Sequence, residues 1–332
     1  MSAVATTPVG EPILRVEGLE AGFPSAQGTA RVLDGVDFTV QKGEILGIVG
    51  ESGSGKTITA LSLMQLLPDA CRVERGEIHF RGENLLTLGP RRMNRLRGEA
   101  VSMIFQNPRT SLNPLFRVEK TLAQVLRTHR GLKGAAARQA SLALLADVGL
   151  PDPERIMRRY PHELSGGMCQ RVMIAFALAS EPTLLIADEP TTALDVTVQL
   201  QVLELLARLR RDHELTLLLI THNLSVVAEL CDRVMVMYLG QIVEHGPVTD
   251  VFDHPRHPYT IGLLGSRPSL HARDDLVAVP GTVPDPRDRP SGCPFHTRCA
   301  HARDVCRSER PQREAAGPGH DVACHRWREL SD

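Results

Sequence analysis

The sequence has no apolar run long enough to cross a membrane as a helix. The run LTLLLI at 215–220 is only strand-sized, whereas a spanning helix needs about 20 apolar residues. The N-terminus, MSAVATTPVGEP, lacks the basic start and the apolar core of a secretory signal. We therefore expect a protein that stays in the cytosol.

The sequence also lacks an excess of charge of either sign. Its 38 Lys and Arg residues nearly balance its 39 Asp and Glu residues, which gives a formal net charge of −1. A balanced charge argues against general electrostatic binding to nucleic acid. The one basic run, RRMNRLR at 91–97, is interpreted as a solvated helix face. We expect no nucleic-acid partner.

Cysteine is scarce except near the C-terminus. Four of the seven cysteines lie in the last forty residues, at Cys293, Cys299, Cys306 and Cys324. In the cytosol such clusters are more often metal or redox sites than disulfide frameworks. The gaps of five, six and seventeen residues contain no C-x-x-C pair, which fits common zinc ribbons and fingers poorly.

Four thiolates in loops rich in Pro and Gly could instead hold a [4Fe–4S] cluster, which needs four cysteines and tolerates varied spacing. Two alternatives stay open: zinc, and four free thiols in a poorly ordered tail. Substitute zinc ligands would be His296, His301, His320 or His325. Because the tail has few apolar residues of its own, a metal would supply much of its ordering energy.

The chain divides into three segments by composition. Residues 1–11 are small and polar, and we expect them to be disordered. From about residue 12 to residue 254, short β-rich runs alternate with helical patterns, which predicts an α/β domain. Residues 255–332 are rich in Pro, His and Arg, and we expect an appended tail of short helices and loops.

The stretch EILGIVGESGSGKTITALSLMQLL predicts a phosphate-binding loop. A buried strand at 45–49 and a helix at 57–67 flank GESGSGKT, which fits the pattern G-x-x-x-x-G-K-[ST]. Glycines let the backbone N–H groups surround a phosphate, and the helix N-terminus adds partial positive charge. Lys56 should reach the β- and γ-phosphates and the Thr57 hydroxyl should bind Mg²⁺. The predicted ATP contacts are Gly50, Glu51, Ser52, Gly53, Ser54, Gly55, Lys56 and Thr57.

The segment TLLIADEP at 183–190 supplies the second half of the predicted site. An apolar strand carries Asp188 at its C-terminal end, where open α/β sheets bind ligands. Asp188 is predicted to hold Mg²⁺, and Glu189 is placed to polarise an attacking water.

A second anion-binding pattern lies in YPHELSGGMCQR at 160–171. Ser-Gly-Gly at the start of a helix exposes backbone donors and a hydroxyl to an anion. A second phosphate-binding device implies a second nucleotide contact, which two subunits meeting head to tail would use. The residues predicted to contact ATP on the partner subunit are Leu164, Ser165, Gly166, Gly167 and Gln170.

The LSGG segment, followed by this acidic strand, resembles the nucleotide-binding domain of ABC transporters over residues 12–254. The resemblance implies a P-loop NTPase core with an antiparallel β subdomain and a helical insertion at about 107–164, followed by a small irregular metal-binding extension. It places Phe23 against adenine, Gln106 at Mg²⁺ and the transmembrane partner, Asp195 in the loop between paired sites, and His222 at the γ-phosphate. Mg²⁺ would then be held by Thr57, Gln106 and Asp188.

The resemblance also implies how the protein works. Two nucleotide domains would close around two ATP molecules, each held between one phosphate loop and the partner's LSGG. Glu189 would act as general base, with His222, Lys56 and Mg²⁺ stabilising charge on the γ-phosphate. All the hydrolytic positions are present in the chain, so the resemblance implies an active ATPase.

The segments FQNPRTSLNPLFRV, VFDHPRHPYTIGLL and GCPFHTRC resemble ATP-binding subunits of oligopeptide, dipeptide and nickel importers. Such subunits work with a homologous subunit, two membrane permeases and an extracytoplasmic substrate-binding protein, at the cytoplasmic face of the membrane. Peptide is the expected cargo and nickel the alternative; a soluble ABC ATPase of DNA repair or translation is a further alternative. Relatives with this tail are thought to bind a [4Fe–4S] cluster.

Overall fold

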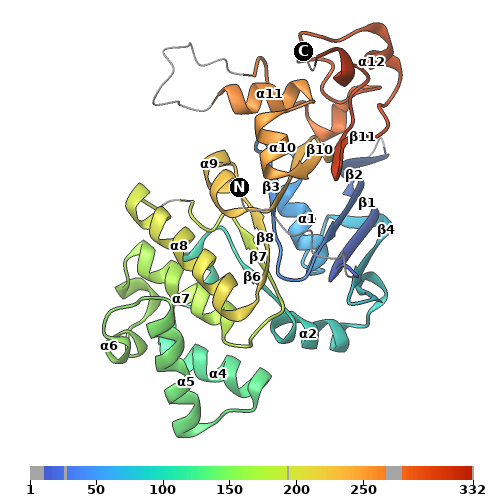
Figure 1. Ribbon diagram of the computed structural model, residues 1–332. Helices are drawn as coiled ribbons and strands as arrows, with labels where there is room; N and C mark the ends of the chain where they lie inside the picture. The colour runs from blue at the N-terminus through green and yellow to red at the C-terminus, as the bar shows by residue number, and fades with distance from the viewer. Residues whose placement is uncertain (1–10, 26–27, 193, 267–278, 331–332) are drawn as a thin grey trace.

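The computed structural model describes residues 11–25, 28–192, 194–266 and 279–330. The segment predicted to be disordered is 1–11, and its residues 1–10 lie outside the described part. Two sheets organise the molecule, with a group of helices on one side and the C-terminal extension at one end (Figure 1).

The strands are β1 (Leu14–Ser25), β2 (Gly28–Val40), β3 (Ile45–Val49), β4 (Arg72–Phe80), β5 (Glu83–Asn84), β6 (Val101–Ile104), β7 (Leu184–Asp188), β8 (Thr216–Ile220), β9 (Arg233–Tyr238), β10 (Gln241–Pro247), β11 (Glu314–Gly317) and β12 (His320–Val322). The α-helices are α1 (Lys56–Leu63), α2 (Pro90–Glu99), α3 (Pro108–Ser111), α4 (Val118–Arg130), α5 (Gly134–Asp147), α6 (Pro153–Met157), α7 (Gly166–Leu178), α8 (Val196–His213), α9 (Leu224–Leu230), α10 (Val248–Asp253), α11 (Pro258–Gly265) and α12 (Asp304–Ser308). Short 3₁₀ helices are η1 (Leu85–Thr87), η2 (Pro161–Glu163), η3 (Pro286–Asp288) and η4 (Trp327–Glu329).

The larger sheet is mixed, with strand order β11-β12-β10-β9-β3-β8-β7-β6. Strands β9, β3, β8, β7 and β6 run parallel, and their residues are almost all buried. Parallel strands have both faces covered, so their sequences read as continuous apolar runs rather than alternating ones. This is the α/β architecture that the sequence predicts.

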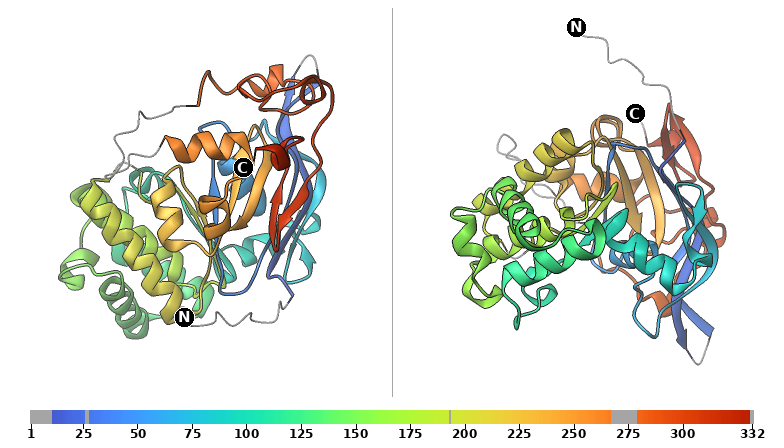
Figure 2. Two further views of the ribbon diagram at one scale, coloured as in Figure 1. Left: turned by 45° about the horizontal axis from the view of Figure 1, so that its top comes forward. Right: turned by 90° about the horizontal axis from the view of Figure 1, so that it is seen from below.

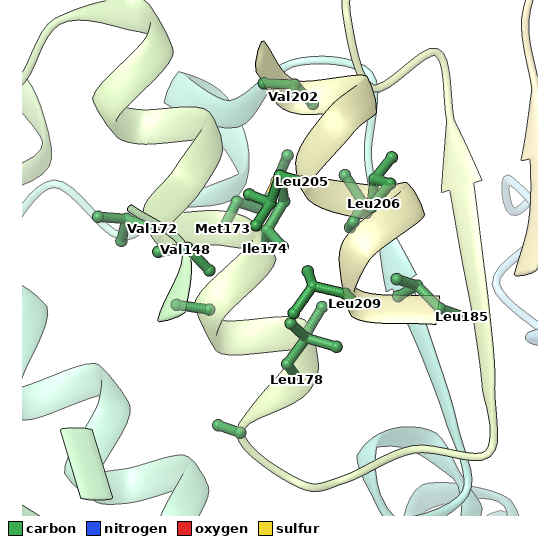
Figure 3. Close-up of a cluster of buried hydrophobic side chains, with 14 of the residues drawn as sticks. Val148, Val172, Met173, Ile174, Leu178, Leu185, Val202, Leu205, Leu206 and Leu209 are labelled. Atoms are coloured by element: carbon green, nitrogen blue, oxygen red, sulfur yellow. The ribbon is translucent and has the colours of Figure 1, made fainter. Parts of the chain in front are cut away.

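The two faces of this sheet belong to different cores. Leu185 packs with the helices α7 and α8, whereas its neighbour Leu184 packs with α1 and the second sheet. Figure 3 shows Met173 and Leu178 of α7 close to Leu205 and Leu209 of α8. Because side chains alternate along a strand, α1 and α7 lie on opposite faces of the sheet.

The second sheet is antiparallel, with order β2-β1-β4-β5. It confirms the expected antiparallel β subdomain and lies on the side of the molecule away from α4 and α5 (Figure 2). The range expected to form a helical insertion, 107–164, contains α3 to α6 and η2. No helix in the described part of the chain combines the length and the apolar character needed to cross a bilayer.

The C-terminal extension differs from the irregular appendage that we expected. Strand β12 pairs antiparallel with β10, and β11 pairs with β12, so the hairpin continues the central sheet. Phe295 and two of the tail cysteines share one core with Val49 and Tyr238 of the central strands. The extension is therefore packed into the domain, and its apolar contacts come largely from the sheet.

Candidate functional site

The candidate site lies where the parallel strands end. Gly50 follows β3, Gln106 follows β6, Glu189 follows β7 and His222 follows β8. The carboxyl ends of parallel strands meet at one edge of the sheet, which is the usual ligand site of open α/β folds. The structure thus brings together predicted residues from four separate segments.

The phosphate-binding loop needs its glycines. Gly50 has φ of 153°, and a Cβ there would lie 2.2 Å from the carbonyl oxygen of Met237. Gly55 caps α1 with φ of 105°, and its Cβ would meet Leu33 Cδ2 at 2.9 Å. Only glycine tolerates both the conformation and the close approach.

Helix α1 ends at Leu63, four residues before the predicted end. It ends there because Gln65 takes a left-handed φ of 47° and Leu66 N–H donates to Leu61 O.

Lys56 is buried within this loop. Its Nζ donates to the carbonyl oxygens of Gly50 at 2.8 Å and Glu51 at 2.9 Å. Burial lowers the pKa of Lys56, while the carboxylates of Glu189, Asp188 and Glu51 act in the opposite direction. The ammonium is thus held by acceptors of the loop itself, at the place where a phosphate would replace them.

Thr57 and Asp188 come from opposite halves of the predicted site and meet in the structure. Thr57 Oγ1 donates to Asp188 Oδ1 at 3.3 Å. Burial raises the pKa of Asp188, and the neighbouring Glu189 raises it further. Thr57 is exposed and Asp188 is buried. A hydroxyl and a carboxylate side by side are the hard oxygen ligands that Mg²⁺ prefers, so this pair fits the predicted Mg²⁺ position.

Glu189 is the centre of a hydrogen-bond network. Its Oε2 accepts from Gln106 Nε2 at 2.9 Å and from Thr192 Oγ1 at 2.8 Å. Its Oε1 lies 3.2 Å from Nδ1 of the exposed His222. The residue itself has a left-handed φ of 47°, which is uncommon outside glycine and is found at functional sites.

The environment keeps Glu189 ionised. Burial raises its pKa, but hydrogen bonds from Thr192 and His222 and the charges of His222 and Lys56 outweigh this effect, so the pKa lies below its ordinary value. The neighbouring Asp188 is shifted upward instead. Two adjacent carboxylates with opposite shifts are suited to different roles. Glu189 is suited to accept a hydrogen bond from a water molecule.

The LSGG segment lies apart from this centre. Ser165 caps α7, its Oγ accepting from Met168 N–H at 3.3 Å, and Ser165 is exposed while Leu164 is buried. Because α7 and α1 lie on opposite faces of the sheet, this helix N-terminus is not placed on the chain's own phosphate loop. Among the described residues, no hydrogen bond joins the two segments.

Comparison with known proteins identifies the family. A family model described as ABC transporter matches residues 33–192. The probable peptide ABC transporter ATP-binding protein y4tR of Sinorhizobium fredii is 47% identical over 98% of this chain and 98% of its own length. This chain belongs to the ABC transporter family.

Other comparisons agree with this assignment. A second family model, described as the C-terminal region of oligopeptide/dipeptide transporters, matches residues 243–306. The oligopeptide transport ATP-binding protein OppD of Salmonella typhimurium is 48% identical over 94% of this chain and 93% of its length. The dimeric ATP-binding cassette MJ0796 bound to ADP and Pi matches with a TM-score of 0.64 at 25% identity, over 71% of this chain and 98% of that one. The chain is thus an ATPase of the ABC cassette fold.

Within the described part of the chain, three predicted residues of this ABC ATPase form no hydrogen bond with Glu189. Phe23 is half-buried on β1, opposite Ala30 of β2. Asp195 caps α8 by accepting from Val198 N–H at 3.0 Å. Gln170 is only 1% exposed, so its amide is not presented to a partner's nucleotide in this conformation. The roles of Phe23 and Asp195 stay predictions, and burial argues against the role given to Gln170.

Three residues of the ABC ATPase site could not be predicted from local sequence patterns. Thr192 donates to Glu189, and its place in TTALD after the acidic pair was the only available signal. Tyr259 and Arg298 lie in the C-terminal extension and both contact Glu51 of the phosphate loop. Nothing local in the sequence connects them to a loop more than 200 residues earlier.

The four tail cysteines line one small cavity. It is bounded by Cys293, Cys299, Cys306 and Cys324, and His257, His296, His301 and His325 also contribute. Burial raises the pKa of Cys293 to about 12 and that of Cys324 to about 11. His320 is not among the lining residues and instead contacts Glu244 at 2.8 Å. The structure therefore brings the predicted cysteines together and separates His320 from them.

Proposed function

We propose that this chain hydrolyses ATP to power the import of di- and oligopeptides, at the cytoplasmic face of the cell membrane. The main support is that the chain is similar, over nearly its full length, to proteins named for peptide transport. In addition, residues 243–306 match a family model for the C-terminal region of oligopeptide/dipeptide transporters. These names favour peptide over nickel and over a soluble ATPase of repair or translation. The proposed partners are a homologous ATP-binding subunit, two permeases and an extracytoplasmic binding protein.

The residues of the centre divide the hydrolytic work. The phosphate loop and Lys56 would bind the β- and γ-phosphates. Glu189 would accept a hydrogen bond from the attacking water, since its environment keeps it ionised. Gln106 and Thr192 hold its carboxylate in place from one side and His222 from the other. Thr57, Asp188 and Gln106 would hold Mg²⁺, which neutralises phosphate charge when bound.

The exposed LSGG segment would complete a second subunit's site. Ser165 and the first N–H groups of α7 provide anion-binding donors, and Gly167 has no room for a side chain, since a Cβ would lie 2.7 Å from Val198 Cγ1. In the assembled pair each ATP would lie between one chain's phosphate loop and its partner's LSGG. The isolated chain should therefore bind ATP but hydrolyse it slowly.

The test is ATPase activity of the complex reconstituted in proteoliposomes with both ATP-binding subunits, the permeases and the binding protein. Peptide-loaded binding protein should stimulate hydrolysis, and Ni²⁺ should not.

A second experiment tests the phosphate loop. Lys56→Ala should weaken ATP binding strongly, because a buried triphosphate loses its charge-assisted partner. Lys42→Ala is the matched control, since Lys42 has a 68% exposed side chain. Stimulation by Ni²⁺ alone would overturn the peptide cargo, and unchanged ATP affinity of Lys56→Ala would overturn the phosphate-loop assignment.

We also propose that Cys293, Cys299, Cys306 and Cys324 hold a [4Fe–4S] cluster. Arg326 N–H donates to Cys324 Sγ at 3.4 Å, and the backbone N–H groups of Phe295 and His301 act to lower the pKa of the Cys293 and Cys299 thiols against the larger effect of burial. Such donors stabilise thiolates. The donor set therefore fits four-cysteine ligation of a cluster.

The cysteine sulfurs that the structure describes are not gathered into a compact zinc site. Tetrahedral zinc with Zn–S bonds of about 2.3 Å would bring its sulfur ligands to within about 3.8 Å of one another. Within the described part of the chain, no three of the cysteine sulfurs lie within 4.8 Å of one another. A cube of four irons is larger than a single ion, so a cluster does not require sulfurs as close as zinc does.

His257 supports a bound group in the same cavity. Its Nδ1 accepts from Tyr259 N–H at 3.0 Å, so the neutral ring carries its proton on Nε2. That buried Nε2 has no acceptor among the described residues, and a cluster sulfur would provide one.

Anaerobic purification followed by iron, sulfide and zinc analysis tests the proposed [4Fe–4S] cluster. Stoichiometric zinc without sulfide would overturn the cluster, and absence of both metals would overturn any metal site.

A further inference from the structure

The phosphate-binding loop is tied to the C-terminal extension by an ion pair. Arg298 Nη1 lies 2.6 Å from Glu51 Oε2, and Arg298 Nη2 lies 3.0 Å from Glu51 Oε1. The pair is bidentate, which is the strongest and most directional form of an arginine–carboxylate contact. It joins residues 247 positions apart in the sequence. Glu51 is the second residue of GESGSGKT, so the contact acts directly on the loop.

Arg298 is held rigidly in its place. Its side chain is only 4% exposed, and it donates to the carbonyl oxygens of Pro280 at 2.7 Å and Gly281 at 3.3 Å. Its guanidinium also lies 5.7 Å from the ring centre of Tyr238 and 5.9 Å from that of Phe295, within the range of cation–π attraction. The arginine is therefore oriented before it meets Glu51.

Glu51 is fixed at its backbone as well. Its N–H donates to the Tyr259 hydroxyl at 2.8 Å, and its carbonyl oxygen accepts from Lys56 Nζ at 2.9 Å. Tyr259 packs against Tyr238 and Phe295, with ring centres 4.8 Å and 5.3 Å away. Two residues of the extension thus hold the same loop residue on which the phosphate-binding lysine rests.

The charge of Glu51 makes this contact important for nucleotide binding. The carboxylate is near enough to Lys56 to influence its pKa, so it also lies near the expected position of the phosphates. An unpaired carboxylate there would repel the triphosphate and compete for Lys56. Pairing with Arg298 compensates that charge and holds both carboxylate oxygens.

We propose that Arg298 is a positioning residue of the ATP site, which acts through Glu51 to keep the phosphate-binding loop in its ATP-accepting shape. This inference rests on the proposed binding of ATP by the loop. It gives the C-terminal extension a part in nucleotide affinity. Arg298 does not touch the nucleotide in this role, and its effect reaches ATP only through the loop.

The experiment is equilibrium titration of the full-length chain with Mg-ATP. Arg298→Met should raise the Kd at least about tenfold, since it leaves the part-buried carboxylate of Glu51 uncompensated beside the phosphate-binding loop. Arg328→Met is the matched control, because Arg328 pairs with Glu314 in the same extension and its side chain is 73% exposed. In the assembled transporter, Arg298→Met should raise the KM for ATP and leave kcat within about twofold.

A double-mutant cycle with Glu51→Gln shows whether the effect passes through Glu51. Glu51→Gln is measured alone as the second single variant, and adding it to Arg298→Met should recover at least part of the affinity that Arg298→Met loses. Wild-type affinity of a folded Arg298→Met variant, or strictly additive effects of the two changes, would overturn the proposal. If Arg298→Met does not fold, Arg298→Lys replaces it in the same cycle. Loss of ATP binding in Lys56→Ala tests the ATP site independently of either result.

Discussion

Gln106 Nε2 donates to Glu189 Oε2 over 2.9 Å, which joins the end of β6 to the end of β7. Gln106 is exposed and next to the exposed Phe105, on the segment that leads into the helices α3 to α6. A shift of those helices would therefore reach the carboxylate of Glu189 through a single side chain. This contact provides a physical link between the helical part of the chain and the centre of hydrolysis.

Glu189→Gln should leave ATP binding largely intact and trap the closed, ATP-bound pair of subunits. The amide cannot accept a proton from water, so hydrolysis in the assembled complex should slow by at least about a hundredfold. Phosphate release and gel filtration with ATP measure the two effects. Glu229→Gln is the control, since Glu229 is an exposed glutamate in the nearby α9. Near-normal turnover with the change in both subunits would remove Glu189 from this role.

Thr192→Val should shift the pH dependence of hydrolysis. The Thr192 hydroxyl lowers the pKa of Glu189, so its loss raises that pKa and leaves less carboxylate ionised at a given pH. The acid limb of the plot of kcat against pH should move to higher pH. On that acid side, the kcat of Thr192→Val should be on the order of tenfold lower than that of the wild type at the same pH. The conservative Thr192→Ser should restore the wild-type profile, and Thr249→Val, an exposed site, should not alter it. A lower kcat with an unmoved limb would argue that Thr192 acts only in packing.

The strand, loop and helix of the phosphate site could be predicted because their residues are contiguous. A buried apolar strand, glycines in a fixed pattern and a following helix all lie within 45–63. The contacts of Glu189 with Gln106 and of Glu51 with Arg298 join residues 83 and 247 positions apart. Tertiary packing alone creates such pairs, and no local pattern in one sequence records them.

The hairpin of the extension could not be predicted because its strands have little intrinsic strand character. Strand β11 reads EAAG and β12 reads HDV, which have few of the β-branched and aromatic residues typical of strands. Pairing with β10 holds them in the sheet. The cysteine cluster was predicted from composition, but its shared core with Tyr238 and Tyr259 required the fold.

Ser165→Ala should separate two functions of the LSGG serine. Loss of the cap on α7 should lower the free energy of unfolding by about 1 kcal/mol. The ATP affinity of the isolated chain should not change, because Ser165 is not placed on the chain's own phosphate loop. Hydrolysis by the assembled complex should fall at least about tenfold, by analogy with the loss of other oxyanion donors. Asn84→Ala, which removes the cap on η1, provides a capping control. Equal loss of stability with full ATPase activity would restrict Ser165 to a structural role.

Cys299→Ala should remove the metal and destabilise the extension. Cys299 lines the same cavity as the other three cysteines, so its loss would leave the proposed cluster with three protein ligands. The protein as purified anaerobically should contain about four iron atoms and four sulfides per chain, and the variant should contain neither in that ratio. Since metal binding contributes folding energy, the Tm should fall by at least about 5 °C. Cys71→Ala, a buried cysteine outside the extension, should keep the iron. An unchanged metal content and Tm in Cys299→Ala would show that the thiol is not a ligand.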